Sequence, residues 1–215
     1  MINTVIFDLD GTLLYTLEDL RDSTNYALLK FNYDPRSLDE IRTFVGNGVR
    51  RLIEKSLPCG AENPVFEECL SEFKKHYLLN MYNKTAPFQG IDGLLSTLKE
   101  KNIHIAVVSN KYDRAVKELC EKYFKNKIEL AVGESENIRK KPAPDSVLSV
   151  INQFDVGIQT VLYVGDSDVD IQTAKNASVK SVGVTWGYRS RELLVSEGAD
   201  FIVNKPFEIL DLLDK

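Results

Sequence analysis

The sequence predicts an α/β protein in which helices wrap both faces of a parallel β-sheet and an all-helical segment interrupts the sheet early. Short apolar runs alternate with amphipathic helical patterns over most of the 215 residues. One stretch, from about residue 16 to about residue 85, has helical spacing of apolar residues and no strand pattern. Together these observations favour a core domain with a helical insertion.

Five apolar runs are expected to form the sheet, and helical patterns separate them. The expected strands are residues 5–7, 103–108, 161–164, 181–184 and 201–203. Strands that alternate with helices in this way form parallel, Rossmann-like sheets, and the active sites of such sheets gather beyond the carboxyl ends of the strands. Polar residues that directly follow a strand are therefore the first candidates for a functional site.

The helical insertion divides the chain into a core of residues 1–15 and 86–215 and a second, all-helical domain of residues 16–85. Capping-box patterns at 16–19 and 37–40 predict two helix starts within it. Asn63-Pro64 predicts a third, with an N-cap and a first-turn proline. Apolar residues at helical spacing follow, which indicates a buried helix face.

Composition excludes several classes of protein. The net charge is −5 and no long basic block is present, which argues against nucleic-acid binding. The three cysteines are widely spaced, which argues against a disulfide framework. No signal-peptide pattern and no apolar run of about 20 residues occurs, so we expect no membrane span and a cytoplasmic location. A monomer and a homodimer are both compatible with the sequence.

Four groups of polar residues stand after strands or before helices. They are Asp8 with Asp10, Ser109 with Asn110, Lys141 in "RKKPAPD", and the acids of "VGDSDVD" at 164–170. Each group alone has an ordinary structural explanation. Asp-Gly forms turns, serine caps helices, lysine is usually solvated, and acids are favourable at helix N-termini.

Considered together, the four groups predict a shared site. Carboxylates that follow different strands of one parallel sheet meet at one edge, where they repel each other unless a cation is present. Oxygen ligands of this kind suit Mg²⁺. Lys141 and the groups around Ser109 could then hold phosphoryl oxygens, and a carboxylate nucleophile beside a metal is equipped for phosphoryl transfer.

Competing motifs fail on individual residues. A calcium-binding loop starting at Asp166 would need glycine at Ile171 and an acid at Ala177. A dinucleotide fingerprint starting at Gly46 would need glycine at Arg51. No P-loop pattern is present, and the two histidines lack zinc-like spacing.

The stretches "FDLDGTL", "VVSNK", "KKPAPD" and "VGDSDVD" resemble, in order and spacing, the four motifs of the haloacid-dehalogenase-like hydrolase superfamily. The helical insertion is similar to the cap domain of the subgroup in which the cap follows the first strand. "TFVGNGVRRLIEKSL", "SVGVTWGY" and "EGADFIV" are similar to phosphoglycolate phosphatases within that subgroup. The resemblance implies a phosphoric monoester hydrolase.

The resemblance also implies residue roles. Asp8 would be the nucleophile, and Asp10 would be the general acid and then the general base. Asp8, the backbone carbonyl of Asp10, and Asp166 would hold Mg²⁺, and Asp170 would support these ligands. The residues implied to bind the phosphoryl group are Ser109, Asn110 and Lys141. The residues expected to reach the substrate from the cap are Gly46, Asn47, Gly48 and Arg50.

The expected activity is Mg²⁺-dependent hydrolysis of a small phosphorylated metabolite, with 2-phosphoglycolate first among the substrates. Relatives that lack the second acid are dehalogenases and phosphonate-cleaving enzymes, so Asp10 favours a phosphatase or a phosphomutase. The alternatives are a sugar phosphomutase, a phosphatase for pyrophosphate or nucleotide monophosphates, and a non-catalytic protein that binds a phosphorylated ligand.

Overall fold

The computed structural model describes residues 1–135 and 138–214, which form two compact units. The first unit contains Met1–Leu14 and the chain from Pro87 onward, and the second contains Tyr15–Ala86. The short strands β2 (Leu14–Tyr15) and β3 (Ala86–Pro87) form a separate two-stranded sheet and carry the chain between the units.

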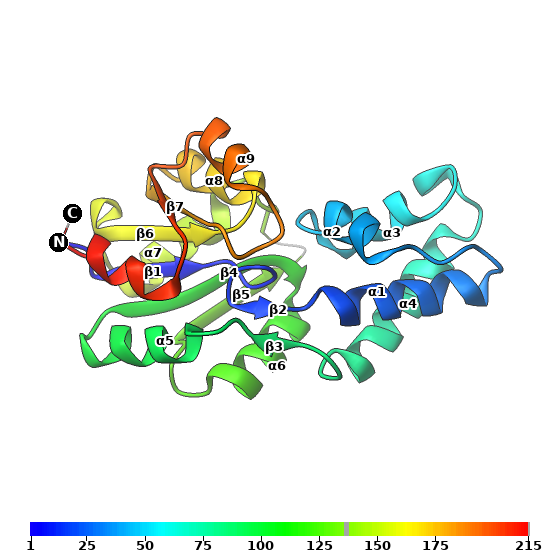
Figure 1. Ribbon diagram of the computed structural model, residues 1–215, viewed down its shortest axis with the longest axis horizontal. Coiled ribbons are helices and arrows are strands. Elements are labelled where there is room, and N and C mark those ends of the chain that lie inside the picture. The colour runs from blue at the N-terminus through cyan, green and yellow to red at the C-terminus, as the bar shows by residue number, and fades with distance from the viewer. Residues whose placement is uncertain (136–137, 215) are drawn as a thin grey trace. The chain divides into compact units, whose positions relative to one another are not determined.

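The first unit is built on a six-stranded parallel sheet with strand order β5-β4-β1-β6-β7-β8 (Figure 1). Its strands are β1 (Thr4–Phe7), β4 (His104–Tyr112), β5 (Leu130–Glu134), β6 (Val161–Gly165), β7 (Lys180–Val184) and β8 (Phe201–Val203). The predicted fold class is confirmed. The apolar runs did not predict β5, an edge strand whose residues are mostly half-buried and include Gly133 and Glu134.

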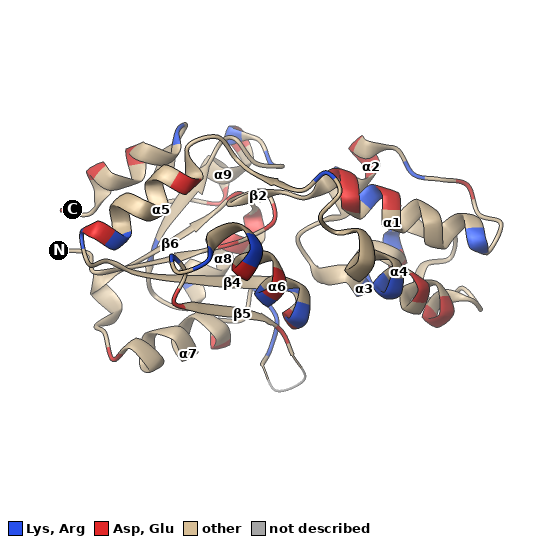
Figure 2. Cartoon of the chain, turned by 90° about the horizontal axis from the view of Figure 1, so that it is seen from below, with Lys and Arg blue, Asp and Glu red and all other residues tan. Residues whose placement is uncertain are grey.

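Helices alternate with these strands along the chain. They are α5 (Ile91–Glu100), α6 (Asp113–Phe124), α7 (Asp145–Phe154), α8 (Asp168–Asn176) and α9 (Arg191–Ser196), with short 3-10 turns at Ile158–Thr160 and Pro206–Leu212. In Figure 2, α5 and α7 lie on opposite sides of the sheet, and most charged residues lie on helices and loops. The apolar faces of the helices therefore cover the sheet and their charged faces meet water.

One face of the sheet packs against α7 and α8. Alternate residues of the central strands, including Ile6, Val108 and Tyr163, join Val147 and Ala174 from these two helices in one buried cluster. Because successive side chains of a strand point to opposite faces, the residues between them face the other helix layer. Tyr163 is the residue in this cluster that carries a hydroxyl group, and that group becomes important below.

The second unit consists of the helices α1 (Leu17–Lys30), α2 (Leu38–Phe44), α3 (Gly48–Ser56) and α4 (Phe66–Asn80), with a 3-10 turn at Gly60–Glu62. The capping box of Ser37 and Glu40 is confirmed at the start of α2. Asn63 does not cap α4 directly, because the helix begins at Phe66 and the Asn63 side chain instead accepts a hydrogen bond from the Val65 N–H.

The capping box predicted at Thr16 is wrong, since the Thr16 side chain makes no capping hydrogen bond. Its expected partner, Asp19, is buried and has another role. The Asp19 carboxylate accepts hydrogen bonds from the backbone N–H groups of Lys84 and Thr85 and from the Thr85 hydroxyl. Asp19 thereby fixes the end of the second unit to its first helix.

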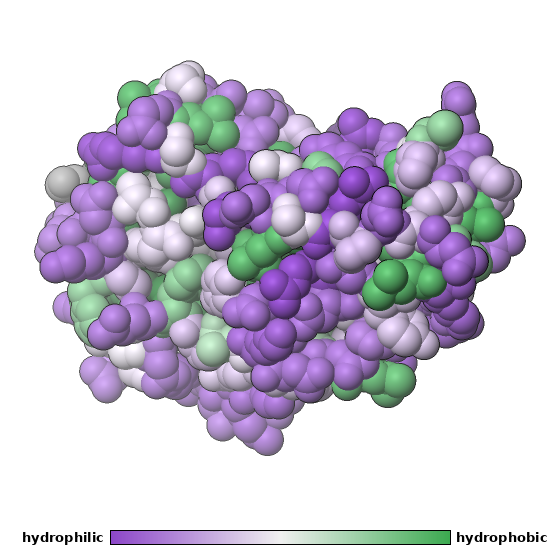
Figure 3. Space-filling model, turned by 45° about the vertical axis from the view of Figure 1, so that its right-hand side comes forward, coloured by the Kyte–Doolittle hydropathy of each residue, from purple (hydrophilic) through white to green (hydrophobic). Residues whose placement is uncertain are grey.

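Hydrophilic residues dominate the face that Figure 3 draws. Figure 3 shows hydrophobic residues scattered among hydrophilic ones on the face in view. Among the described residues, no helix combines the length and the hydrophobicity that crossing a membrane requires.

Candidate active site

The register of the sheet aligns the strands that carry the candidate residues. Phe7 of β1 is level with Val107 of β4 and with Val164 of β6. The backbone N–H of Asp8 donates to the Val164 carbonyl at 2.9 Å, so Asp8 leaves the sheet beside the start of the loop that follows β6. Three of the predicted groups of polar residues therefore emerge at the same edge of the sheet. They are Asp8 with Asp10, Ser109 with Asn110, and the acids of residues 164–170.

Lys141 joins two of these groups through its side chain. Its ammonium group donates to Asp8 Oδ1 at 2.7 Å and to Asp170 Oδ1 at 2.7 Å. All three side chains are at most 10% exposed. An ammonium group buried between two carboxylates is held in place by charge-assisted hydrogen bonds, which are stronger than neutral ones.

Burial and charge act in opposite directions on this cluster. Burial raises the pKa of Asp8 to about 7, although the positive charge of Lys141 acts to lower it. Burial also raises the pKa of Asp166 well above its usual range, and the negative charges of Asp170 and Asp8 add to this increase. Burial acts to lower the pKa of Lys141, but the attraction of Asp170 and Asp8 outweighs it, so that pKa is well above its usual range.

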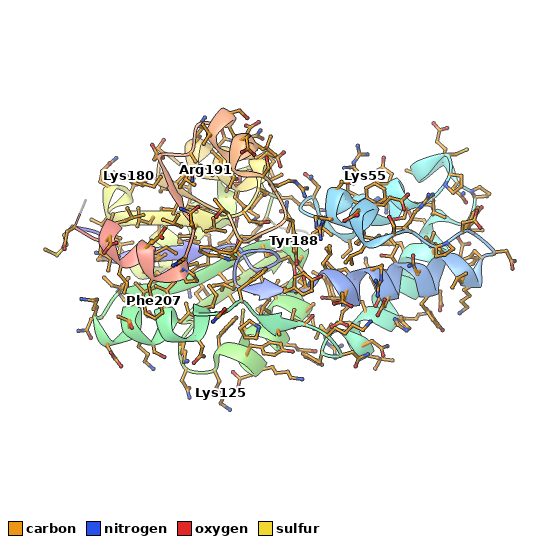
Figure 4. The ribbon with its side chains drawn as sticks, in the orientation of Figure 1. Lys55, Lys125, Lys180, Tyr188, Arg191 and Phe207 are labelled. Atoms are coloured by element: carbon orange, nitrogen blue, oxygen red, sulfur yellow. The ribbon has the colours of Figure 1, made fainter. Side chains whose placement is uncertain are left out.

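Asp166 lies in a space that two glycines leave open. A Cβ atom at Gly11, where φ is +89°, would lie 2.4 Å from Asp166 Oδ2, and a Cβ atom at Gly187 would lie 2.2 Å from Asp166 Cβ. The carboxylate accepts a hydrogen bond from the Tyr188 N–H at 2.6 Å. Tyr188 belongs to the loop after β7 and is labelled in Figure 4. No side chain larger than hydrogen fits at either glycine without displacing Asp166.

The same loop also holds the turn that follows β1. The indole N–H of Trp186 donates to the backbone carbonyl of Thr12 at 2.9 Å, and the Thr12 hydroxyl lies 3.4 Å from Asp166 Oδ1. This loop was identified from the sequence only through the similarity of "SVGVTWGY". The structure shows that it contacts both the turn beside Asp10 and the acid that follows β6.

Asp10 pairs with Lys111, for which the sequence predicted no role. Lys111 Nζ donates to both carboxylate oxygens of Asp10, at 2.9 and 3.0 Å. The Lys111 side chain is 2% exposed and that of Asp10 is 13% exposed. The signal was present in "SNK", because Lys111 is two residues beyond Ser109, and alternate residues of a strand share a face. It was missed because the strand was expected to end at residue 108.

Ser109 and Asn110 lie in the last part of β4. The Asn110 side-chain amide donates to the Lys141 carbonyl at 3.0 Å, and its oxygen accepts from the Lys141 N–H at 2.8 Å. The side chain of Asn110 thus fixes the backbone of Lys141. Ser109 Oγ accepts a hydrogen bond from the Lys111 N–H at 3.3 Å, and Ser109 is buried.

The composition of the cluster fits a divalent cation. Asp8, Asp166 and Asp170 offer carboxylate oxygens that all lie within 4.8 Å of one another. With Asp10, four carboxylates stand against the two ammonium groups of Lys111 and Lys141 in the ion pairs described above. With all four carboxylates ionised, these pairs leave two negative charges, which one Mg²⁺ would balance. Asp170 is the least available ligand, because Lys141 occupies Oδ1 and Ser167 donates twice to Oδ2.

The residues expected to reach the substrate from the cap all lie in the second unit. Gly46 and Gly48 have positive φ values, 118° and 81°, and Asn47 is the N-cap of α3. Arg50 is half exposed, pairs with Glu67 at 2.6 Å, and has its guanidinium 4.7 Å from the centre of the Phe66 ring. These contacts hold Arg50 on the surface of its own unit.

Comparison with known proteins agrees with the motifs. The family model described as haloacid dehalogenase-like hydrolase matches residues 5–184. The chain belongs to the haloacid dehalogenase-like hydrolases. Among relatives, the phosphoglycolate phosphatase of Aquifex aeolicus is 33% identical, with 99% of this chain and 97% of that protein covered. The N-acetylmuramic acid 6-phosphate phosphatase of Pseudomonas aeruginosa is 28% identical, with 100% and 96% covered.

Solved structures of similar proteins have the same fold. A protein from Lactobacillus delbrueckii that is provisionally named a phosphoglycolate phosphatase superposes with a TM-score of 0.92 at 32% identity, covering 98% of both chains. A predicted phosphoglycolate phosphatase from Haemophilus somnus also gives 0.92, at 26% identity. The four motifs of this chain therefore lie on a hydrolase scaffold.

Proposed function

We propose that this hydrolase is a Mg²⁺-dependent phosphatase that cleaves a small phosphate monoester through an aspartyl-phosphate intermediate on Asp8. The observation that carries the proposal is the buried ammonium of Lys141, 2.7 Å from Asp8 Oδ1 and within a cluster of carboxylates. A positive group beside a carboxylate nucleophile offsets the repulsion between the nucleophile and an anionic phosphate.

The reaction has two displacements at phosphorus. A carboxylate oxygen of Asp8 attacks the phosphorus atom, the ester P–O bond breaks, and the leaving oxygen takes a proton from Asp10. A water molecule then attacks the phosphorus of the aspartyl phosphate, Asp10 accepts its proton, and the bond between phosphorus and the Asp8 oxygen breaks. Phosphate and the alcohol are released, and both aspartates return to their starting protonation states.

The remaining residues bind and orient. Asp8, the backbone carbonyl of Asp10, and Asp166 would hold Mg²⁺, which when bound offsets negative charge on the phosphoryl oxygens. Ser109 and Lys141 would bind the phosphoryl group. Asn110 would contribute by fixing the Lys141 backbone, as its two hydrogen bonds to that residue support.

The first candidate substrate is 2-phosphoglycolate, because relatives with that activity in their names cover nearly the whole chain. A sugar 6-phosphate is the second candidate, because a phosphatase named for one matches the chain over its full length. The helical unit would select between them through Gly46, Asn47, Gly48 and Arg50. If Arg50 binds a substrate carboxylate, Arg50→Ala should raise KM more than it lowers kcat.

The test is a phosphate-release screen with Mg²⁺ over 2-phosphoglycolate, sugar 1- and 6-phosphates, nucleoside monophosphates and pyrophosphate, repeated with EDTA. We expect release that EDTA abolishes, and a loss of about 1,000-fold or more in kcat for Asp8→Asn. Asp168→Asn is the matched control, because Asp168 lies in the same segment as Asp166 and faces Arg189 at 3.7 Å.

Two outcomes would contradict the proposal. Formation of a sugar phosphate isomer without free phosphate would identify a phosphomutase. Retained turnover in Asp8→Asn, at a level similar to that of Asp168→Asn, would exclude Asp8 as the nucleophile and with it the aspartyl-phosphate mechanism.

A further inference from the structure

A tyrosine hydroxyl lies inside the cluster of charged groups, and the mechanism above does not use it. Tyr163 is in β6, is 1% exposed, and faces the buried layer formed with α7 and α8. Its hydroxyl is 2.9 Å from Lys141 Nζ, 3.1 Å from Asp170 Oδ1 and 3.4 Å from the Val108 carbonyl. A buried hydroxyl costs free energy unless it is hydrogen-bonded. The hydroxyl of Tyr163 meets this requirement through the charged groups of the site.

Counting protons assigns the direction of each bond. A lysine ammonium has three N–H donors, and those of Lys141 are matched by Asp8 Oδ1, Asp170 Oδ1 and the Tyr163 hydroxyl oxygen. Tyr163 therefore accepts from Lys141 and has its own proton available for Asp170 or for the Val108 carbonyl. Burial raises the pKa of Tyr163 well above its usual range, so the hydroxyl keeps that proton.

These bonds form a closed triangle of Lys141, Asp170 and Tyr163. Asp170 is itself anchored, because Ser167 donates to its other oxygen through both its N–H and its hydroxyl. With two N–H groups of Lys141 bonded to Asp170 and Tyr163, the third N–H group points toward Asp8. Catalytic donors act most strongly when they are oriented before the reaction begins, because no energy is then needed to reorient them.

We propose that Tyr163 is a positioning residue, whose hydroxyl holds the Lys141 ammonium in the orientation that faces Asp8. This inference rests on the proposed phosphatase function. Without the hydroxyl, Lys141 keeps its two ionic partners but loses its third contact, and its head group is free to shift between them. The effect should be greater on the transition state than on bound phosphate, because a donor oriented in advance stabilises the charge and geometry that develop during the reaction.

The test variant is Tyr163→Phe, which keeps the buried ring and removes only the hydroxyl. The control is Tyr123→Phe, the same change at a half-buried position of α6. For the best substrate of the screen, we expect Tyr163→Phe to lower kcat about tenfold with KM changed less than about threefold. The inhibition constant of orthovanadate, which mimics the transition state, should rise about tenfold, and the dissociation constant of inorganic phosphate should change much less. Tyr123→Phe should match the wild type.

A purely structural role predicts a different result. It would lower the melting temperature and leave the ratio of vanadate affinity to phosphate affinity unchanged, and that result would overturn the proposal. Assays well below the melting temperature of the variant separate the two effects. The proposal would also be overturned if the wild type is active and the kcat and vanadate inhibition constant of Tyr163→Phe are both within twofold of the wild-type values. A wild type that releases no phosphate from any substrate refutes the proposed function instead.

Discussion

Asp8 has an environment that disfavours its charge in the metal-free protein. Its pKa is raised to about 7, whereas an unfolded aspartate has a value near 3.8. Between these two values the folded state binds more protons than the unfolded state, so stability is greatest at low pH and falls as the pH rises through this window. The carboxylate therefore costs stability at neutral pH, as expected for a group that is retained for chemistry.

This leads to a prediction for Asp8→Asn in EDTA. The neutral amide removes the cost of the buried charge, so the variant should melt about 5 °C higher than the wild type at pH 8. The difference should narrow as the pH is lowered to 5, where the wild-type carboxyl is protonated. Thermal unfolding monitored by circular dichroism measures both values. A difference that widens on acidification would show that the pKa of Asp8 is not raised.

Lys111 donates hydrogen bonds to both carboxylate oxygens of Asp10, at 2.9 and 3.0 Å. If Asp10 donates its proton to the leaving oxygen, removing Lys111 should matter most for leaving groups that need a proton. We predict that Lys111→Met lowers kcat about tenfold or more for an alkyl phosphate and much less for p-nitrophenyl phosphate, whose leaving group departs as a stable anion. Steady-state kinetics with both esters measures the difference.

Lys117→Met is the control for that variant, since Lys117 is 61% exposed and pairs with Asp113 on the surface of α6. It should leave both substrates unaffected. Equal losses on the two esters in Lys111→Met would show that Lys111 acts on another step.

At the scale of elements, the loop after β7 packs closely against Asp166, which follows β6. Gly187→Ala would place a methyl group 2.2 Å from Asp166 Cβ, so the loop or the carboxylate must move. We predict a loss of Mg²⁺ affinity of about tenfold or more, measured by calorimetry, together with a cost of about 1–3 kcal/mol in unfolding free energy.

Gly157→Ala provides the comparison. A Cβ atom there would meet nothing closer than the Thr160 methyl carbon at 3.9 Å, and the φ of Gly157 is −74°. It should bind Mg²⁺ as the wild type does. Normal Mg²⁺ affinity in Gly187→Ala would show that the glycine at this position is not needed to place Asp166.

The elements also show how far sequence alone could go. Apolar runs predicted five of the six core strands. Four of these are central strands, which are buried on both faces and therefore largely apolar, and the fifth is the edge strand β8, whose three residues Phe201–Val203 are all apolar. The edge strand β5 and the polar end of β4 escaped prediction because neither needs such a run. The capping box at Ser37 formed, but the one at Thr16 did not, because Asp19 bonds backbone groups 65 and 66 residues further along the chain.

The same limit applies to the site. The sequence singled out the acids and Lys141 because charged groups after buried strands are conspicuous. Lys111 and Tyr163 were missed because their side chains reach their partners across strands, and pairing distances between strands cannot be obtained from spacing along the chain. Tyr163 in particular resembles any core aromatic residue until its hydroxyl partners are known.

For the whole molecule, the buried cluster of Asp8, Asp166 and Asp170 predicts that stability depends on Mg²⁺. A cation that binds only the folded state stabilises it by mass action. We predict that Mg²⁺ at about 100 times its dissociation constant, in excess over EDTA, raises the melting temperature by several degrees at pH 7.5. Scanning calorimetry of the wild type and of Asp166→Asn measures the shift, which should be absent in the variant. An equal shift in both proteins would place the ion elsewhere.

The chain contains one tryptophan, and its indole bonds the turn between Asp10 and Leu14. Its emission spectrum is therefore an intrinsic optical signal from one known position beside the turn that follows Asp10. Stopped-flow fluorescence of the unlabelled protein could follow movements of that turn during a single turnover, with no dye to attach and no second indole to contribute background.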